Sequence, residues 1–184
     1  MQPHSFGGSL PAVSPIFWIT GPPGAGKTTI ARALLARFPF GYHVQVDELR
    51  KWVVSGLSES VNWTDETSRQ FMLAEESAAS VASVYQRAGF AVVIDHCRNL
   101  QRIDAIEREH LRDVGLVKIC LLPSLDENLR RNRERDTKSF DPAVLDFIVR
   151  GMNPSMAESP SPGWRVLDTT HLSVEETVGR ILEV

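Results

Sequence analysis

Five short segments that are rich in apolar residues are spread along this chain. These segments are residues 16–20, 42–46, 90–94, 116–122 and 165–167. The segment 90–94 is continuously apolar and rich in aromatic and β-branched residues, which is typical of a strand buried on both faces of a sheet, and residues 116–122 are interpreted in the same way. The pattern therefore predicts a five-stranded parallel sheet.

The parts of the chain between these segments carry apolar residues at helical spacing. The longest predicted helix begins at Thr64 and ends at Gly89. Residues 152–163 contain three prolines and predict an irregular loop. Because strands alternate with helices throughout, we expect a three-layer α/β/α fold with helices on both faces of the sheet. Further helices are expected over residues 27–37, 47–54 and 124–135, and after Asn99, Asp141-Pro142 and Ser173.

Two short patterns predict where helices begin. Ser124 with Glu127, and Ser173 with Glu176, have the spacing of capping boxes, in which each side chain of the pair bonds the other residue's backbone N–H. Each box lies between a predicted strand and an amphipathic segment, so we expect both to start a helix.

Composition narrows the classes of function. The 184 residues suit one domain, expected over residues 15–184 after a flexible tail at residues 1–14. Twenty Lys and Arg residues against 23 Asp and Glu residues leave no electrostatic reason to expect wrapping by nucleic acid or docking on an anionic membrane. We see no signal peptide and no apolar stretch of roughly 20 residues, so we expect a soluble, cytoplasmic protein.

The most specific feature is the segment G-P-P-G-A-G-K-T at residues 21–28, which matches the phosphate-binding pattern G-x-x-x-x-G-K-[ST]. It lies between a predicted strand and a predicted helix, as the pattern requires. Gly24 and Gly26 permit backbone angles that let the chain touch an anion, and the backbone N–H groups lie at the positive end of the helix. Lys27 would reach the β- and γ-phosphates of a nucleotide, and the Thr28 hydroxyl would hold Mg²⁺.

Asp47 follows the second predicted strand, and Arg50 lies one helical turn later. At a strand end beside a phosphate loop, this carboxylate is placed to accept the proton of an attacking hydroxyl, while Arg50 orients the substrate. The alternative is local: Asp47 caps a helix and forms an i,i+3 ion pair with Arg50. Trp52, Trp63 and Phe71 follow where an acceptor would bind, and packing alone explains them equally well.

Asp95 ends the most apolar of the predicted strands. A carboxylate there binds Mg²⁺ through water or pairs with the Thr28 region, and the alternative is a carboxylate that accepts backbone N–H groups at the start of a loop. The next residue is His96 rather than a glutamate that would polarise water, which favours group transfer over hydrolysis. We interpret His96 itself as a packed or hydrogen-bonding side chain.

Four arginines crowd the end of one predicted helix, at positions 130, 131, 133 and 135. Guanidinium groups bind phosphate oxygens and stabilise charge that develops during phosphoryl transfer. Arg131 and Arg135 share a helix face, so we expect a lid around residues 130–140 that closes over a nucleotide. The alternative is a solvated helix end, where cations are favourable in any case.

In this order the segments resemble the P-loop kinases, in the branch that includes polynucleotide 5′-hydroxyl kinases, chloramphenicol phosphotransferases, gluconate-type kinases and zeta-toxin-like kinases. The resemblance covers nearly the whole chain after the tail and rests on residues 21–29, 46–50, 92–95, the lid arginines and residues 166–170. It implies the P-loop NTPase fold with strand order 2-3-1-4-5, with ATP and Mg²⁺ as cofactors. The sequence D-H-C-R after the third strand departs from the small residues common there and indicates an unusual acceptor pocket.

The resemblance also implies a role for each candidate residue. Thr29 would touch the α-phosphate, and residues 168–170 would lie near the adenine. The catalytic residues would be Lys27, Asp47, Arg50, Arg131 and Arg135. The nucleotide would be bound by Gly21, Gly24, Ala25, Gly26, Lys27, Thr28, Thr29, Arg131, Asp168 and Thr170, and the metal by Thr28 and Asp95.

The sequence therefore predicts an ATP-dependent phosphotransferase that acts on a hydroxyl group of a small molecule. A polynucleotide or nucleotide kinase is a weaker alternative, because the residues around Asp47 are acidic. A nucleotide-dependent ATPase or switch module that binds a protein partner is a second alternative, disfavoured by the missing glutamate after Asp95. The identity of the acceptor does not follow from the fold.

Overall fold

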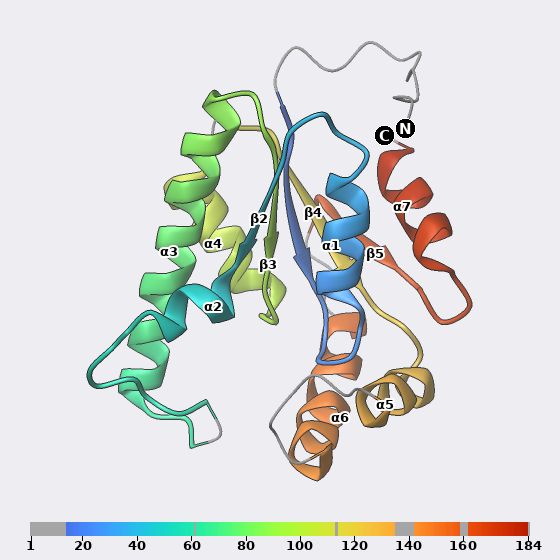
Figure 1. Ribbon diagram of the computed structural model, residues 1–184. Coiled ribbons are helices and arrows are strands. Elements are labelled where there is room, and N and C mark those ends of the chain that lie inside the picture. The colour runs from blue at the N-terminus through green and yellow to red at the C-terminus, as the bar shows by residue number, and fades with distance from the viewer. Residues whose placement is uncertain (1–13, 61, 113, 135–141, 159–161, 184) are drawn as a thin grey trace.

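The computed structural model describes the chain except for residues 1–13, 61, 113, 135–141, 159–161 and 184. Its sheet consists of β1 (Ile16–Thr20), β2 (Gly41–Gln45), β3 (Ala91–Asp95), β4 (Leu116–Leu121) and β5 (Trp164–Leu167). Neighbouring strands are parallel, in the order β2-β3-β1-β4-β5 (Figure 1). The predicted five-stranded parallel sheet and its strand order are confirmed.

Helices cover both faces of this sheet (Figure 1). One face carries α1 (Lys27–Leu35) and α7 (Val174–Leu182), and the other carries α3 (Asp65–Arg87) and α4 (Leu100–His110). The short helix α2 (Val46–Lys51) follows β2, while α5 (Leu125–Arg133) and α6 (Pro142–Glu158) lie beyond the end of the sheet to which β1 leads. Within the part of the chain that is described, no helix is both long and apolar enough to cross a membrane.

The central strand β1 contributes to two separate apolar cores. Ile16 and Trp18 pack with residues of α3 and α4, whereas Phe17 and Ile19 pack with residues of α1 and α7. Each of these four side chains is at most 3% exposed. Because both faces are covered, every position of the strand is apolar or small, which explains the absence of polar alternation in the sequence.

The prediction of a loop over residues 152–163 was wrong for residues 152–158, because α6 continues to Glu158 with Pro154 inside it, while residues 159–161 lie outside the described part of the chain. A proline in a helix interior costs about 3 kcal/mol, since it removes one hydrogen bond and crowds the preceding turn. Tertiary contacts stabilise the part of the helix that precedes this position. Val149 is fully buried, and the Asn153 side chain donates a 2.9 Å hydrogen bond to the carbonyl of Pro123.

The capping pattern at the C-terminal helix was predicted correctly. The Ser173 hydroxyl accepts from the backbone N–H of Glu176, and the Glu176 carboxylate accepts from the backbone N–H of Ser173. This reciprocal box fixes the start of α7 directly after the loop that follows β5.

We expect the stability of the protein to be sensitive to the shortening of a buried side chain on α4. Ile103 is fully buried against the sheet, so Ile103→Ala should lower the free energy of unfolding by about 2–5 kcal/mol. Val84 on α3 is 56% exposed, and Val84→Ala should change it by less than about 0.5 kcal/mol. Urea denaturation followed by circular dichroism measures both values, and equal effects would contradict the assigned core.

Candidate functional site

The order of the strands brings three predicted site segments to one edge of the sheet. β3 lies between β2 and β1, and the register aligns Asp95 with Gln45 on one side and with Ile19 on the other. Because all three strands are parallel, the residues that follow them emerge side by side at the carboxyl edge. This is the edge at which open α/β sheets bind ligands.

The loop after β1 has the backbone of a phosphate cradle. Gly26 has φ of +93° and caps α1 without a side-chain hydrogen bond, and no acidic side chain lies in the first turn of the helix. A Cβ atom at Gly26 would meet no atom within 4 Å, whereas one at Gly21 would lie 2.4 Å from the carbonyl oxygen of Leu121. The positive end of α1 therefore faces open space, as an anion site requires.

The charged side chain of this loop is folded back onto the loop itself. Lys27 Nζ donates hydrogen bonds to the carbonyl oxygens of Gly21, at 2.9 Å, and Pro22, at 3.1 Å. Ala25 is buried in the core beside α1, while Thr29 is exposed in the first helical turn. Among the described contacts, the ammonium group is thus held by two carbonyl groups of the loop, which a phosphate can replace.

Thr28 and Asp95 are joined directly. The Thr28 hydroxyl donates a 2.6 Å hydrogen bond to Asp95 Oδ2, and His43 Nε2 lies 3.4 Å from the same oxygen. Burial alone would raise the pKa of the Asp95 carboxyl, but His43, the positive charge of Lys27 and the Thr28 hydroxyl outweigh it and hold the pKa below its ordinary value. A hydroxyl beside an ionised carboxylate suits the oxygen ligation that Mg²⁺ prefers.

Asp47 lies in the first turn of α2 with its side chain 47% exposed. Its Oδ1 atom lies 3.7 Å from Nδ1 of His96, the residue after Asp95. The helix cap is Gln45, and no ion pair joins Asp47 to Arg50 among the described contacts. The purely local alternative, a helix cap with an i,i+3 ion pair, is therefore not what the structure shows.

Arg50 has a different environment from the one expected of a substrate contact. It is 8% exposed and donates to the backbone carbonyl of Ser58 and, at 2.6 Å, to the Ser60 hydroxyl. Its guanidinium lies 4.5 Å from the centre of the Phe71 ring, which in turn stacks on Trp63 at 5.1 Å. In this structure Arg50 holds the loop between α2 and α3 against α3.

The lid helix α5 is tied to the loop after β5. Arg131 Nη2 donates to the carbonyl oxygens of Thr169, at 2.8 Å, and Thr170, at 3.4 Å. Asp168 accepts a 2.9 Å hydrogen bond from the backbone N–H of Thr170. The structure thus brings together two groups that the sequence analysis assigned to the nucleotide, the lid arginine and residues 168–170.

The cap of α5 differs from the predicted capping box. The Ser124 hydroxyl accepts from the backbone N–H of Glu127, but the Glu127 carboxylate is bound by Arg130 and Arg131 instead of returning to Ser124. The backbone N–H of Ser124 donates to the Thr170 hydroxyl at 2.8 Å. A contact expected within the helix is replaced by one to a distant loop.

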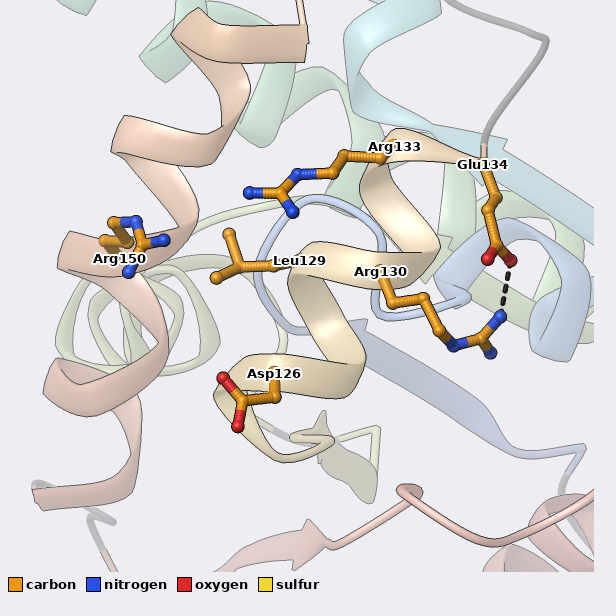
Figure 2. Close-up of a pocket in the computed structure, with 6 residues that line it drawn as sticks. All are labelled: Asp126, Leu129, Arg130, Arg133, Glu134 and Arg150. Carbon is orange, nitrogen blue, oxygen red and sulfur yellow. Dashed lines mark hydrogen bonds and ion pairs between the residues drawn. The ribbon is translucent and has the colours of Figure 1, made fainter.

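The remaining lid arginines are neutralised by carboxylates. Arg130 pairs with Glu127 and Glu134, and Arg133 pairs with Asp146 at 2.7 Å. Arg135 lies outside the described residues. A hollow of roughly 360 Å³ lies between α5 and α6, and Figure 2 shows the residues that line it. None of them was assigned to catalysis, nucleotide or metal binding, and we do not assign the hollow to the site. Its lining consists of Asp126, Leu129, Arg130, Arg133, Glu134 and Arg150.

Two buried polar residues near the site gave no signal in the sequence. Asn128 is fully buried, and its amide donates a 2.6 Å hydrogen bond to the Pro23 carbonyl, which joins α5 to the phosphate loop. Glu75 is fully buried on α3, 3.2 Å from His96 Nε2 and 2.8 Å from Arg102 Nε. Both types of side chain are usually exposed, so sequence patterns assign them to the surface.

Because Asp95 is ionised in the folded protein, it predicts how acid changes the free energy of unfolding. Because its folded pKa lies below the ordinary value of 3.8, the ionised carboxylate stabilises the fold at neutral pH, and this contribution is lost as the pH falls below about 4. Asp95→Asn should therefore flatten the fall of the free energy of unfolding between about pH 4 and pH 2. Asp65→Asn, at an exposed helix start, is the control. Urea titrations that give parallel curves for wild type and Asp95→Asn would contradict the assignment.

Comparison with known proteins identifies relatives of this chain. A curated relative, the probable adenylyl-sulfate kinase of Aeropyrum pernix, is 27% identical over 166 residues, which are 89% of this chain and 87% of that protein. A sugar kinase structure from Janibacter sp. HTCC2649 matches with a TM-score of 0.67 at 18% identity, over 92% of each chain. The APS kinase CysC of Mycobacterium tuberculosis, in complex with AMPPNP and APS, matches with a TM-score of 0.61 at 20% identity, over 94% of this chain and 98% of that one.

At such low identities the structural matches show the fold alone, which is that of P-loop kinases. The narrower branch named in the sequence analysis stays a prediction. The model of one family, AAA_33, described as an AAA domain, matches residues 16–154, which is more than half of the chain. The chain therefore belongs to the AAA_33 family.

Proposed function

We propose that this protein is an ATP-dependent kinase that transfers the γ-phosphate of ATP to a hydroxyl group of a small molecule. The observation that carries the proposal is the hydrogen bond from Thr28, in a complete phosphate-binding loop, to the buried carboxylate of Asp95. A phosphate cradle and an ionised oxygen ligand for a metal are the two features that phosphoryl transfer requires of a protein.

The nucleotide would bind along the carboxyl edge of the sheet. Backbone N–H groups of the loop and of the first turn of α1 would bind the phosphates, and Lys27 would exchange its two loop carbonyls for phosphate oxygens. The contact of Arg131 with residues 169 and 170 supports a place for both beside the nucleotide. Arg135 would complete the lid, as its spacing from Arg131 suggests.

Thr28 and Asp95 would hold Mg²⁺ against the phosphates, since one supplies a hydroxyl oxygen and the other an ionised carboxylate. When bound, the ion neutralises negative charge on the phosphate oxygens. His43, which lies beside Asp95, helps to keep that carboxylate ionised while it is buried.

The acceptor would bind beside Asp47. Asp47 would take the proton of the acceptor hydroxyl as the acceptor oxygen bonds to the γ-phosphorus, and the bond from phosphorus to the bridging oxygen of ADP would break. Trp63, which is 51% exposed and stacked on Phe71, offers an apolar contact in this region. Relatives with this fold are named for chemically different acceptors, so the fold does not select one.

We expect Lys27→Ala to weaken ATP binding. A hydrogen bond to a charged group contributes about 1.5–3 kcal/mol, so the Kd for MgATP should rise about 10- to 150-fold by calorimetry. Lys51→Ala is the matched control, because Lys51 is exposed and pairs only with Glu48, 2.6 Å away, among the described contacts. Wild-type affinity in Lys27→Ala would overturn the nucleotide site.

We expect Asp47→Asn to separate binding from chemistry. The variant should bind MgATP like the wild type and lose about 10²- to 10⁴-fold in phosphoryl transfer, the usual contribution of a general base. Transfer is measured as acceptor-dependent ADP formation, with an acceptor found by screening antibiotics, sugars and nucleosides. Glu48→Gln, at the exposed neighbouring position, is the control. Transfer at the wild-type rate in Asp47→Asn would rule out this base.

A further inference from the structure

His96 joins two carboxylates that come from different helices. Its Nε2 atom lies 3.2 Å from Glu75 of α3, and its Nδ1 atom lies 3.7 Å from Asp47 of α2. The side chain is 2% exposed, and the Phe71 ring stacks against it at 5.5 Å. Nδ1 is fully buried and has no hydrogen-bond partner among the described residues, so the atom that faces Asp47 is the one left unsatisfied.

Glu75, on the Nε2 side of the ring, is held by several close partners. Glu75 is fully buried, and its two oxygens lie 2.8 Å from Arg102 Nε and 3.0 Å from Arg98 Nε. Burial alone would raise the pKa of the Glu75 carboxyl, but the hydrogen bonds from His96 and Arg102 and the charge of Arg98 outweigh it and lower the pKa. Glu75 is thus an ionised, immobile acceptor for His96.

Asp47 has no comparable support. Its side chain is about half exposed on a helix of six residues, and His96 is its one charged or titratable neighbour in the described contacts. A carboxylate that takes a proton from a substrate must keep its orientation to within small limits, which usually requires a second group that is itself fixed.

We propose that His96 is a positioning residue for the catalytic base: its ring carries an N–H group on both nitrogens, Nε2 donates to Glu75 and fixes the ring, and Nδ1 donates to the Asp47 carboxylate and orients it. The inference rests on the proposed function. One ring nitrogen is fixed by Glu75, so the direction of the other is fixed as well. The 3.7 Å separation suits a contact that shortens when an acceptor displaces water, since catalytic hydrogen bonds are often long in substrate-free structures.

In a purely structural alternative, His96 serves only as a hydrogen-bond partner for the buried carboxylate of Glu75. The two roles use different nitrogens, and two substitutions separate them. In His96→Asn, the side-chain amide takes the place of Nδ1 and keeps a hydrogen-bonding group that faces Asp47. In His96→Gln, the longer side-chain amide takes the place of Nε2 and keeps a hydrogen-bonding group that faces Glu75.

We expect His96→Gln to lower kcat about 10- to 100-fold, the usual cost of losing a supporting hydrogen bond, with the KM for ATP unchanged. His96→Asn should lower kcat less than His96→Gln does, because it keeps a group that faces Asp47 although it loses the contact with Glu75. Thermal unfolding of both variants provides the control for folding. The reverse order of activities, or equal loss in both, would overturn the proposal.

A double-mutant cycle separates this inference from the proposed function. In an Asp47→Asn background, His96→Gln should cause no further loss of transfer, because the group that His96 orients is already disabled. If Asp47→Asn itself retains wild-type transfer, the proposed base is wrong. If Asp47→Asn loses transfer and His96→Gln does not, only the role of His96 fails.

A second measurement needs no acceptor. In ¹⁵N spectra of the full chain, with the His96 signals assigned by loss in His96→Asn, we expect Asp47→Asn to shift the Nδ1 resonance more than the Nε2 resonance. Glu48→Gln should move neither. An Nδ1 resonance that is unchanged in Asp47→Asn would show that the two side chains do not interact in solution and would overturn the proposal.

Discussion

The position of β3 between β2 and β1 is the constraint on which the proposed site depends. β3 is buried on both faces, and its parallel pairing aligns Asp95 with the ends of both neighbours. That alignment puts Asp95 against Thr28 of the phosphate loop on one side and His43 of β2 on the other. It also puts His96 beside Asp47. The apolar packing of one strand thus determines the geometry of both the proposed metal ligands and the proposed base.

The buried charged side chains of the described residues lie close to opposite charges or to hydrogen-bonding groups. Lys118 of β4, which is 8% exposed, lies 2.8 Å from Asp104 and 2.6 Å from Glu107 of α4. Burial alone would lower the pKa of Lys118, but the two carboxylates raise it, so the group stays charged. Every buried charge of this kind costs solvation free energy that only close partners offset. Lys118 joins strand to helix, whereas Glu75 also faces the proposed acceptor side.

The helix α5 connects parts of the proposed nucleotide site that are far apart in sequence. Asn128 bonds the phosphate loop at Pro23, and Arg131 bonds the loop that follows β5. Gly24 packs against the same helix, where a Cβ atom would lie 3.1 Å from Asn128. A nucleotide bound by both loops would therefore also affect the position of α5, which carries the predicted lid arginines. These contacts pack the helix that carries the predicted lid arginines directly against the phosphate loop.

Local signals in the sequence determined the strands, the phosphate loop and the α7 capping box, because each depends on residues that are neighbours along the chain. A continuous apolar run, glycines with positive φ and a serine three residues before a glutamate specify backbone conformation without reference to the rest of the molecule. The approach of Asp95 to Thr28 also followed from the motifs, since parallel strands end at a common edge.

Tertiary structure alone decided the features that depend on distant partners. Pro154 stays in a helix because neighbouring residues such as Asn153 are held by other elements, and the backbone N–H of Ser124 donates to the Thr170 hydroxyl rather than to the Glu127 carboxylate. Glu75 is buried next to His96 although its position in the sequence resembles that of any surface glutamate. A buried polar side chain is stable only when a partner reaches it, and that partner comes from a segment whose place is set by the packing of the whole fold.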